Sequence, residues 1–130
     1  MYKIEKKPYG YRLTFADSIS PDEMNAWVDE SKKVLVTSPT KFGIFVDMRT
    51  LRPLANEARH IMENGQKLYK QNGMERSVVI LSSNLTKIQF KNIARDTGIY
   101  AFERYIDASS EPGWEQIGIK WITEGIDPDK

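Results

Sequence analysis

The sequence of 130 residues contains no cysteine and only one histidine. Without cysteine the chain has no disulfide, no thiol nucleophile and no thiolate metal ligand, which suits a cytosolic protein. Metal centres and catalytic triads need several ligating or titratable groups to converge, and His60 has no second histidine to join it. We therefore expect no metal site, and the sequence implies no cofactor.

An excess of charge and a long apolar run are also missing. Nineteen basic against eighteen acidic residues leave a net charge of +1, so the electrostatics do not favour nucleic acid or an anionic membrane as a partner. No apolar run approaches the ~20 residues that cross a bilayer, and the first residues lack the apolar core of a signal peptide. We expect a single cytoplasmic domain over residues 1–130.

The hydrophobic periodicity predicts strands and helices in alternation. Tyr11, Leu13 and Phe15 alternate with polar residues, as in a half-buried strand, and a strand near Tyr2 completes an N-terminal hairpin. A helix follows, with Ser20 as its N-cap. Further on we expect strands at 42–46, 78–81 and 102–106 and helices at about 55–71, 84–97 and 110–124.

This order predicts an α/β fold, with a mainly parallel mixed sheet that begins with the hairpin and carries helices on both faces. In such sheets, ligands gather at the carboxyl ends of the strands. The loops expected at that edge are 47–54, 82–84 and 107–113.

Some side chains are assigned to the core by helical spacing. In the helix at 84–97, Phe90 lies off the expected inward face, which is made by Leu85, Ile88, Ile93 and Ala94. Aromatic residues at helical spacing are also more often core. The alternative is that five of them line a pocket for an apolar ligand: Trp27, Trp114, Trp121, Phe90 and Tyr100.

Two stretches, "FGIFVDMRTL" and "FERYIDASSEPGWEQIGIKWI", resemble the STAS fold (sulfate transporter and anti-sigma factor antagonist), and more closely its SpoIIAA-like family of small bacterial proteins. The resemblance covers nearly the whole chain. It implies the α/β fold already inferred and a regulatory role exercised through protein contacts.

The resemblance also implies a site. In regulatory members a strand-ending Asp leads into a loop with a second Asp, a phosphorylatable Ser and a Gly at the helix start. Asp47 matches the strand-ending Asp, but segment 52–56 has no Ser, Thr, Asp or Gly. The only hydroxyl in the loop is that of Thr50, which stands several residues too early. We therefore expect no phosphorylation switch at the usual position.

The candidate binding residues lie in two of the three loops. They are Asp47, Arg49, Thr50, Arg52 and Asn56 after the first buried strand, and Ser82 and Ser83 after the second. Arginine binds a carboxylate or phosphate through two parallel hydrogen bonds. Asp47, Arg49 and Arg52 are therefore suited to form the entrance of a binding site for a ligand or a protein partner. Alternatively, Asp47 accepts loop amides and the arginines pair with acids such as Glu57.

The remaining polar candidates have simpler interpretations. Ser82 and Ser83 either cap the next helix, where Thr86 and Gln89 fit a capping box, or contribute to a small-anion site. We expect capping. His60 is expected on a helix surface.

The leading hypothesis is a non-catalytic regulatory or protein-interaction module that contacts an unidentified protein through residues 47–56. The second is a carrier or sensor of a small apolar or anionic ligand. An enzyme using Asp47 with His60 or an arginine is the third. An exposed apolar patch would favour the module, an enclosed apolar pocket of a few hundred Å³ the carrier, and contact of Asp47 with His60 the enzyme. A homodimer is among the assemblies that the sequence leaves open.

Overall fold

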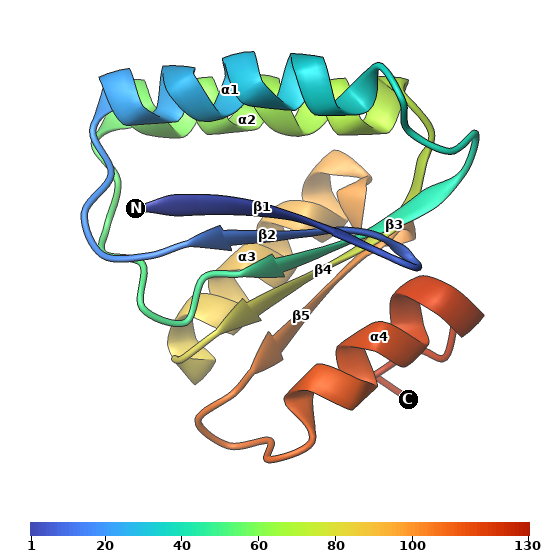
Figure 1. Cartoon of the computed structure of the whole chain (residues 1–130). Helices are drawn as coiled ribbons and strands as arrows, with labels where there is room; N and C mark the ends of the chain where they lie inside the picture. The colour runs from blue at the N-terminus through green and yellow to red at the C-terminus, as the bar shows by residue number, and fades with distance from the viewer.

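The computed structural model describes residues 1–130 as one five-stranded sheet with four α-helices and a short 3-10 helix (Figure 1). The strands are β1 (Tyr2–Lys7), β2 (Gly10–Phe15), β3 (Phe42–Asp47), β4 (Met74–Leu81) and β5 (Glu103–Asp107). The helices are α1 (Pro21–Leu35), α2 (Asn56–Gln71), α3 (Asn84–Thr97), the 3-10 helix η1 (Ile99–Ala101) and α4 (Trp114–Glu124). None of these helices has the length and apolar character needed to span a bilayer.

The sheet has the order β1-β2-β3-β4-β5, with β1 antiparallel to β2 and all other neighbours parallel. The predicted N-terminal hairpin and mainly parallel mixed sheet are confirmed. The hairpin turn depends on Gly10, whose φ is +145°. A Cβ there would lie 2.1 Å from the carbonyl oxygen of Gly43, so only glycine lets β2 start against β3.

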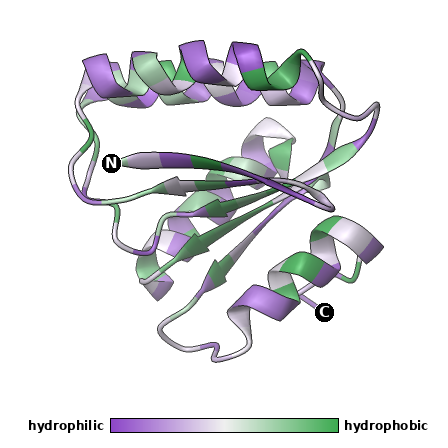
Figure 2. Cartoon of the chain, in the orientation of Figure 1, coloured by the Kyte–Doolittle hydropathy of each residue, from purple (hydrophilic) through white to green (hydrophobic).

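The helices cover the two faces of the sheet unequally. Helices α1, α2 and α3 lie on one face, whereas α4 alone lies on the other (Figure 1). All six residues of β3 are buried, because Ile44 and Val46 face the three helices while Phe45 faces α4. Figure 2 shows the hydrophobic colour concentrated on the middle strands. The core under α4 consists of Phe45, Val78, Ile80, Ile106, Trp121 and Ile122.

Helix α1 begins as the sequence predicts. The hydroxyl oxygen of Ser20 accepts a hydrogen bond from the Glu23 amide at 3.1 Å, and Pro21 occupies the first helical position. The Glu23 carboxylate does not close a capping box, since it pairs at 3.1 Å with the N-terminal ammonium of Met1. This ion pair joins the helix start to the beginning of β1.

The predicted inward face of α3 is confirmed at Ala94, which is buried, and wrong at its other three residues. Leu85, Ile88 and Ile93 are exposed, while Phe90 packs edge-on against Tyr105 with ring centroids 5.9 Å apart. The helix carries two apolar stripes, and only one side of it reaches the sheet. Burying an aromatic ring removes more apolar surface from water than burying an aliphatic side chain, so the face with Phe90 turns inward.

Helix α4 begins at Trp114, four residues later than predicted. The preceding residues form a turn around Asp107, whose carboxylate accepts hydrogen bonds from the amide of Ser109 at 2.9 Å and the hydroxyl of Ser110 at 3.1 Å. These bonds also lower the pKa of Asp107, the Ser109 hydroxyl contributing most. The polar residues that the periodicity assigns to the start of the helix therefore form this turn instead.

Helices α1 and α2 pack closely because Trp27 lies against Gly65. Trp27 is fully buried, packs edge-on against Phe15 at 5.0 Å and stacks on Tyr69 at 5.9 Å. A Cβ on Gly65 would come within 2.2 Å of the indole ring. Tyr69 in turn shares a 2.7 Å hydrogen bond with the buried hydroxyl of Ser31, and burial raises the pKa of Tyr69 to about 12.

We predict that Gly65→Ala destabilises the chain. Helix propensity alone would favour alanine by about 1 kcal/mol. The added methyl must displace a fully buried ring that lies only 2.2 Å away. Overpacking costs roughly 1–3 kcal/mol, and so close an approach puts this variant at about 3 kcal/mol. We expect a net loss of about 2 kcal/mol in the free energy of unfolding, measured by urea denaturation. Asn64→Ala, an exposed neighbour on α2, is the matched control and should be neutral or slightly stabilising; an unaffected Gly65→Ala variant would contradict the packing argument.

Candidate functional site

The first candidate site is built around Asp47, the last residue of β3. Its side chain is only 8% exposed and receives a fork from Arg49, with Nε donating to Oδ1 and Nη2 to Oδ2, both at 3.0 Å. The backbone amide of Arg49 also donates to Oδ1 at 3.1 Å. From β2, Arg12 approaches Oδ2 at 3.4 Å and bonds Glu115 of α4 at 2.8 Å. The carboxylate thus joins two strands, the loop and α4.

The electrostatics favour ionised Asp47. Burial alone would raise the pKa of this carboxyl, but hydrogen bonds from Arg49 and the charges of Arg49 and Arg12 lower it below its usual value. Both guanidinium groups also lie against aromatic rings. Arg49 stands 4.2 Å from the ring centroid of Trp114, and Arg12 stands 4.8 Å from that of Phe45. The positive charges of both arginines are therefore engaged by Asp47 and by the aromatic rings.

The loop that follows Asp47 is fixed to the body of the protein. Leu51 and Leu54 are half-buried and pack against the main core. Backbone bonds tie the loop to Asp17, whose amide donates to the Thr50 carbonyl and whose carbonyl accepts from the Arg52 amide, both at 3.0 Å. Asp17 adopts a left-handed conformation with φ of +58°, which is uncommon for a residue other than glycine.

The predicted site residues fall into two groups. Asp47 and Arg49 are brought together, whereas Thr50, Arg52 and Asn56 stay exposed along the loop and the first turn of α2. Neither predicted arginine pairs with Glu57, because Arg49 pairs with Asp47 and the Arg52 side chain makes no ion pair. Asn56 accepts a hydrogen bond from Arg59 one turn on. The N-cap of α2 is Ala55, which makes no side-chain cap.

Ser82 and Ser83 differ in role. Ser83 is the N-cap of α3, since its hydroxyl oxygen accepts from the Thr86 amide at 3.3 Å, so the capping prediction is confirmed for this residue. The prediction of a capping box made by Thr86 and Gln89 is wrong, because the helix already begins at Asn84. Ser82 donates to the carbonyl of Arg49 at 2.8 Å and so ties β4 to the loop.

His60 lies on the surface of α2, as predicted. Its ring Nδ1 stands 3.8 Å from Glu63, one turn along the same helix, and its side chain is 76% exposed. Glu57 and Asn64, at helical spacing on either side of it, make no hydrogen bond or ion pair with it. Asp47 and His60 therefore share no interaction.

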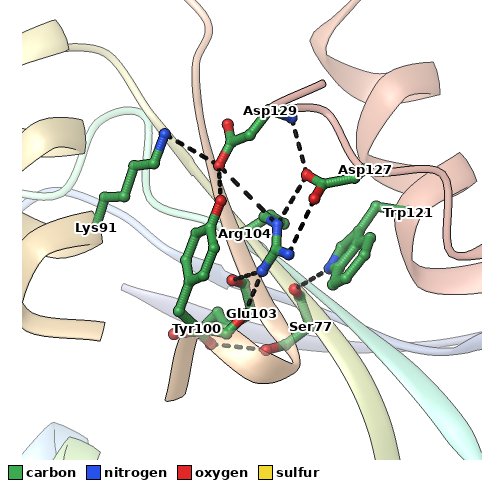
Figure 3. Close-up of polar contacts among 8 residues, drawn as sticks. All are labelled: Ser77, Lys91, Tyr100, Glu103, Arg104, Trp121, Asp127 and Asp129. Atoms are coloured by element: carbon green, nitrogen blue, oxygen red, sulfur yellow. Dashed lines mark hydrogen bonds and ion pairs between the residues drawn. The ribbon is translucent and has the colours of Figure 1, made fainter. Parts of the chain in front are cut away.

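A second polar site, which sequence reasoning missed, surrounds Arg104 of β5 (Figure 3). The Arg104 side chain is 9% exposed. Its guanidinium carbon lies 3.7 Å from the ring centroid of Tyr100 and 4.3 Å from that of Trp121. Lys91 of α3 stands beside them. We call Lys91, Tyr100, Arg104 and Trp121 the Arg104 cluster.

The residues after α4, 125–130, which we call the tail, lie on this cluster. Asp127 receives a fork from Arg104, with Nε donating to Oδ1 at 2.9 Å and Nη2 to Oδ2 at 3.1 Å. Asp129 pairs with Lys91 at 3.1 Å and accepts a hydrogen bond from the hydroxyl of Tyr100. Hydrogen bonding to Arg104 lowers the pKa of Asp127 to about 2.

One sequence feature points to this arrangement. Glu103 and Arg104 are adjacent in a strand, so their side chains lie on opposite faces of the sheet and each needs a partner there. Glu103 accepts hydrogen bonds from Ser77 at 2.7 Å and from the hydroxyl of Tyr105, and burial raises the pKa of Glu103 despite them. The partner of Arg104, however, comes from 23 residues away, which no local pattern reveals.

Two of the hollows on the surface lie near these elements. One of about 220 Å³ opens near the amino ends of β3 and β4 and is lined by Tyr9, Lys41, Phe42, Gly43, Glu75, Ile122 and Thr123. The other, about 90 Å³, lies between β5, the tail and the Asp107 turn, and several charged side chains line it. Neither is an enclosed apolar chamber.

Comparison with known proteins identifies the fold. No protein-family model matches the chain, and no curated protein matches it either. It is similar to a solved structure, an uncharacterized protein of the DUF3478 family with a SpoIIAA-like fold from Shewanella loihica PV-4. The two share 10% sequence identity over 94% of this chain and 92% of that one, with a TM-score of 0.69. The chain has a SpoIIAA-like fold. The predicted STAS, SpoIIAA-like architecture is confirmed.

We predict that neutralising Asp47 loosens the site. Asp47→Asn removes the charge that three hydrogen bonds from Arg49 and one from Arg12 recognise. Hydrogen bonds to charged groups contribute roughly 1.5–3 kcal/mol each, part of which an amide retains, so we expect a loss of about 1–3 kcal/mol. Urea denaturation measures it. The control Glu115→Gln removes the exposed partner of Arg12 and should cost under about 1 kcal/mol; equal losses would contradict a special role for Asp47.

We also predict that the tail contact weakens in acid. The pKa of Asp127 is lowered from 3.8 to about 2 in the folded chain, so its ionised form stabilises the fold above about pH 4 and loses that effect as the pH falls toward 2. Asp127→Asn lacks this contribution at every pH. The difference in unfolding free energy between the natural chain and Asp127→Asn should be constant from about pH 7 to 5 and shrink by about pH 3. Urea denaturation at stepped pH tests this, and a constant difference down to pH 3 would sink it.

Proposed function

We propose that the protein is a non-catalytic regulatory module that acts by binding another protein. Its contact surface, the loop surface, comprises the exposed side chains of residues 49–56 and the first turn of α2. The observation that best supports the proposal is the way in which this loop is attached to the rest of the protein. Its interior side is clamped by Asp47 and anchored by Leu51 and Leu54, while its outer side presents exposed residues that are not used in the fold.

The character of the exposed side chains supports a protein partner. The Arg52 side chain makes no hydrogen bond or ion pair within the chain, and Pro53 beside it is exposed and conformationally restricted. A side chain on a preorganised loop loses less conformational freedom on binding, which improves affinity for a given contact area. Arginine is also enriched in the energetically dominant positions of protein interfaces.

Apolar side chains extend the loop surface on one side. Ser82 bonds the loop at the carbonyl of Arg49, and α3 begins two residues later with Leu85 and then Ile88 exposed. Exposed apolar groups rimmed by polar ones are typical of interaction sites. The alternative carrier of an apolar ligand is less well supported, because the two hollows are open and partly polar.

A phosphorylation switch at the position used by regulatory STAS proteins is not part of the proposal. The turn before α2 carries Pro53, Leu54 and Ala55, and Ala55 is the N-cap. None of these residues has a hydroxyl group to modify. Control of binding, where it exists, must therefore act elsewhere in the chain or through the partner.

A matched pair of baits tests the proposal. In the double variant Arg52→Ala/Asn56→Ala, one basic and one amide side chain leave the loop surface; in the control, Lys32→Ala/Asn25→Ala, the same two types leave exposed positions of α1. Each bait is expressed as the full chain in the protein's own host, cross-linked and purified. We expect one protein to co-purify with the natural chain and the control and to fall at least tenfold with the loop variant.

Native mass spectrometry of the same preparations separates the alternatives. A protein partner held equally by all three baits would contradict the loop surface as the contact. A small-molecule adduct on the natural chain that disappears on denaturation would replace the proposal with the ligand carrier and give the mass of the ligand.

A further inference from the structure

We propose that the Arg104 cluster is a second interaction surface, which binds an acidic segment of a partner protein and is occupied in the free chain by the protein's own tail. It is separate from the loop surface, which lies at the carboxyl end of β3, whereas Arg104 lies near the start of β5. The two can be tested independently.

The guanidinium of Arg104 is oriented to receive a carboxylate. Its Nη1 donates to the backbone carbonyls of Glu103, at 3.0 Å, and of Tyr100. This leaves Nε and Nη2 as a planar fork on the side where Asp127 sits. The rings of Tyr100 and Trp121 lie against the guanidinium group, and the Arg104 side chain is only 9% exposed. A fixed guanidinium fork matches a carboxylate in geometry and in charge.

A second carboxylate position lies beside the first. Lys91 Nζ and the hydroxyl of Tyr100 both reach Asp129, and the Asp129 amide also donates to Asp127 Oδ1 at 2.9 Å. Figure 3 shows the two carboxylates side by side over the cluster. The recognised pattern is therefore Asp-x-Asp in a short turn, where the middle residue, Pro128 in the tail, needs no amide hydrogen.

The tail is held in place by side-chain contacts, as a bound ligand would be. No backbone hydrogen bond joins it to β5; its own backbone bonds run from Gly125 to Trp121 and from Ile126 to Lys120, both in α4, and from Lys130 to Asp127. The side chain of Ile126 is 52% exposed and adds little burial. The side-chain hydrogen bonds and ion pairs that hold the tail all use its two carboxylates.

The buried arginine explains why exchange needs another acidic segment. Removing one partner of a buried ion pair leaves an uncompensated charge, which is strongly destabilising. A departing tail is therefore replaced most readily by a segment that supplies the same two carboxylates. Because the tail is tethered, its effective concentration is in the millimolar range or above, and it competes strongly with a partner in solution.

Neutralising the tail in the full chain opens the cluster for a binding experiment. The probe is a fluorescent peptide with the sequence of residues 124–130, EGIDPDK, and its control is EGINPNK. Fluorescence anisotropy measures binding to Asp127→Asn/Asp129→Asn, to the natural chain and to the charge-matched control Asp29→Asn/Asp96→Asn. We expect the peptide to bind the tail variant at least tenfold more tightly than the other two chains, and EGINPNK to bind none of them.

A further substitution assigns the binding to the cluster. Lys91→Ala on the tail variant should weaken the peptide at least threefold, since it removes a contact made to the second carboxylate. Failure of the folded tail variant to bind EGIDPDK, or equal binding of EGINPNK, would overturn the proposal. If the double variant does not fold, as judged by near-ultraviolet circular dichroism, Asp129→Asn alone keeps the Arg104 fork and should bind the peptide more tightly than the natural chain; no gain would overturn the proposal equally.

Discussion

The carboxylate of Asp47 is the contact on which the carboxyl edge of the sheet depends. It ends a strand that is buried on both faces, where an unpaired charge would be costly. Arg49 of the loop and Arg12 of β2 offset that cost by forming ion pairs with the carboxylate. Through Arg12 the contact continues to Glu115, and through Arg49 to the ring of Trp114, so α4 joins the same network. One buried charge thereby fixes a loop, two strands and a helix relative to one another.

Helix α4 links the two polar sites of the molecule. Trp114 and Trp121 are seven residues apart, which places them on the same face of the helix two turns apart. Each lies against an arginine, Arg49 at 4.2 Å and Arg104 at 4.3 Å. Contacts of this kind contribute up to about 2 kcal/mol when they are shielded from water. Between them Gly118 lets the helix lie close to the sheet, since a Cβ there would be 2.9 Å from the ring of Phe45. The loop and the tail are thus mounted at opposite ends of one rigid helix.

The sequence is sufficient for the order of elements, the hairpin, the parallel sheet and the placing of Asp47 at a strand end, because all of these follow from local periodicity and from the chirality of strand crossovers. It is insufficient where a residue has two equally regular choices. Helix α3 carries apolar side chains on two sides, and the choice of Phe90 over Leu85 is made by Tyr105 on a distant strand. The contacts of Arg12 with Asp47 and of Arg104 with the tail could not be predicted for a related reason. Each joins residues that are far apart in the sequence, so the partner is determined by the fold.

The two arginine forks have the same geometry, yet they restrain segments of very different independence. Arg49 is two residues from Asp47, and its loop is also anchored by half-buried leucines and by backbone bonds to Asp17. Opening that loop means breaking several kinds of contact together. Arg104 and Asp127 are 23 residues apart, and beyond the carboxylate contacts the tail has no backbone pairing to the sheet. The cost of releasing the tail therefore lies mainly in the two carboxylate contacts. The loop is therefore held by several kinds of contact, whereas the tail is held by its two carboxylates.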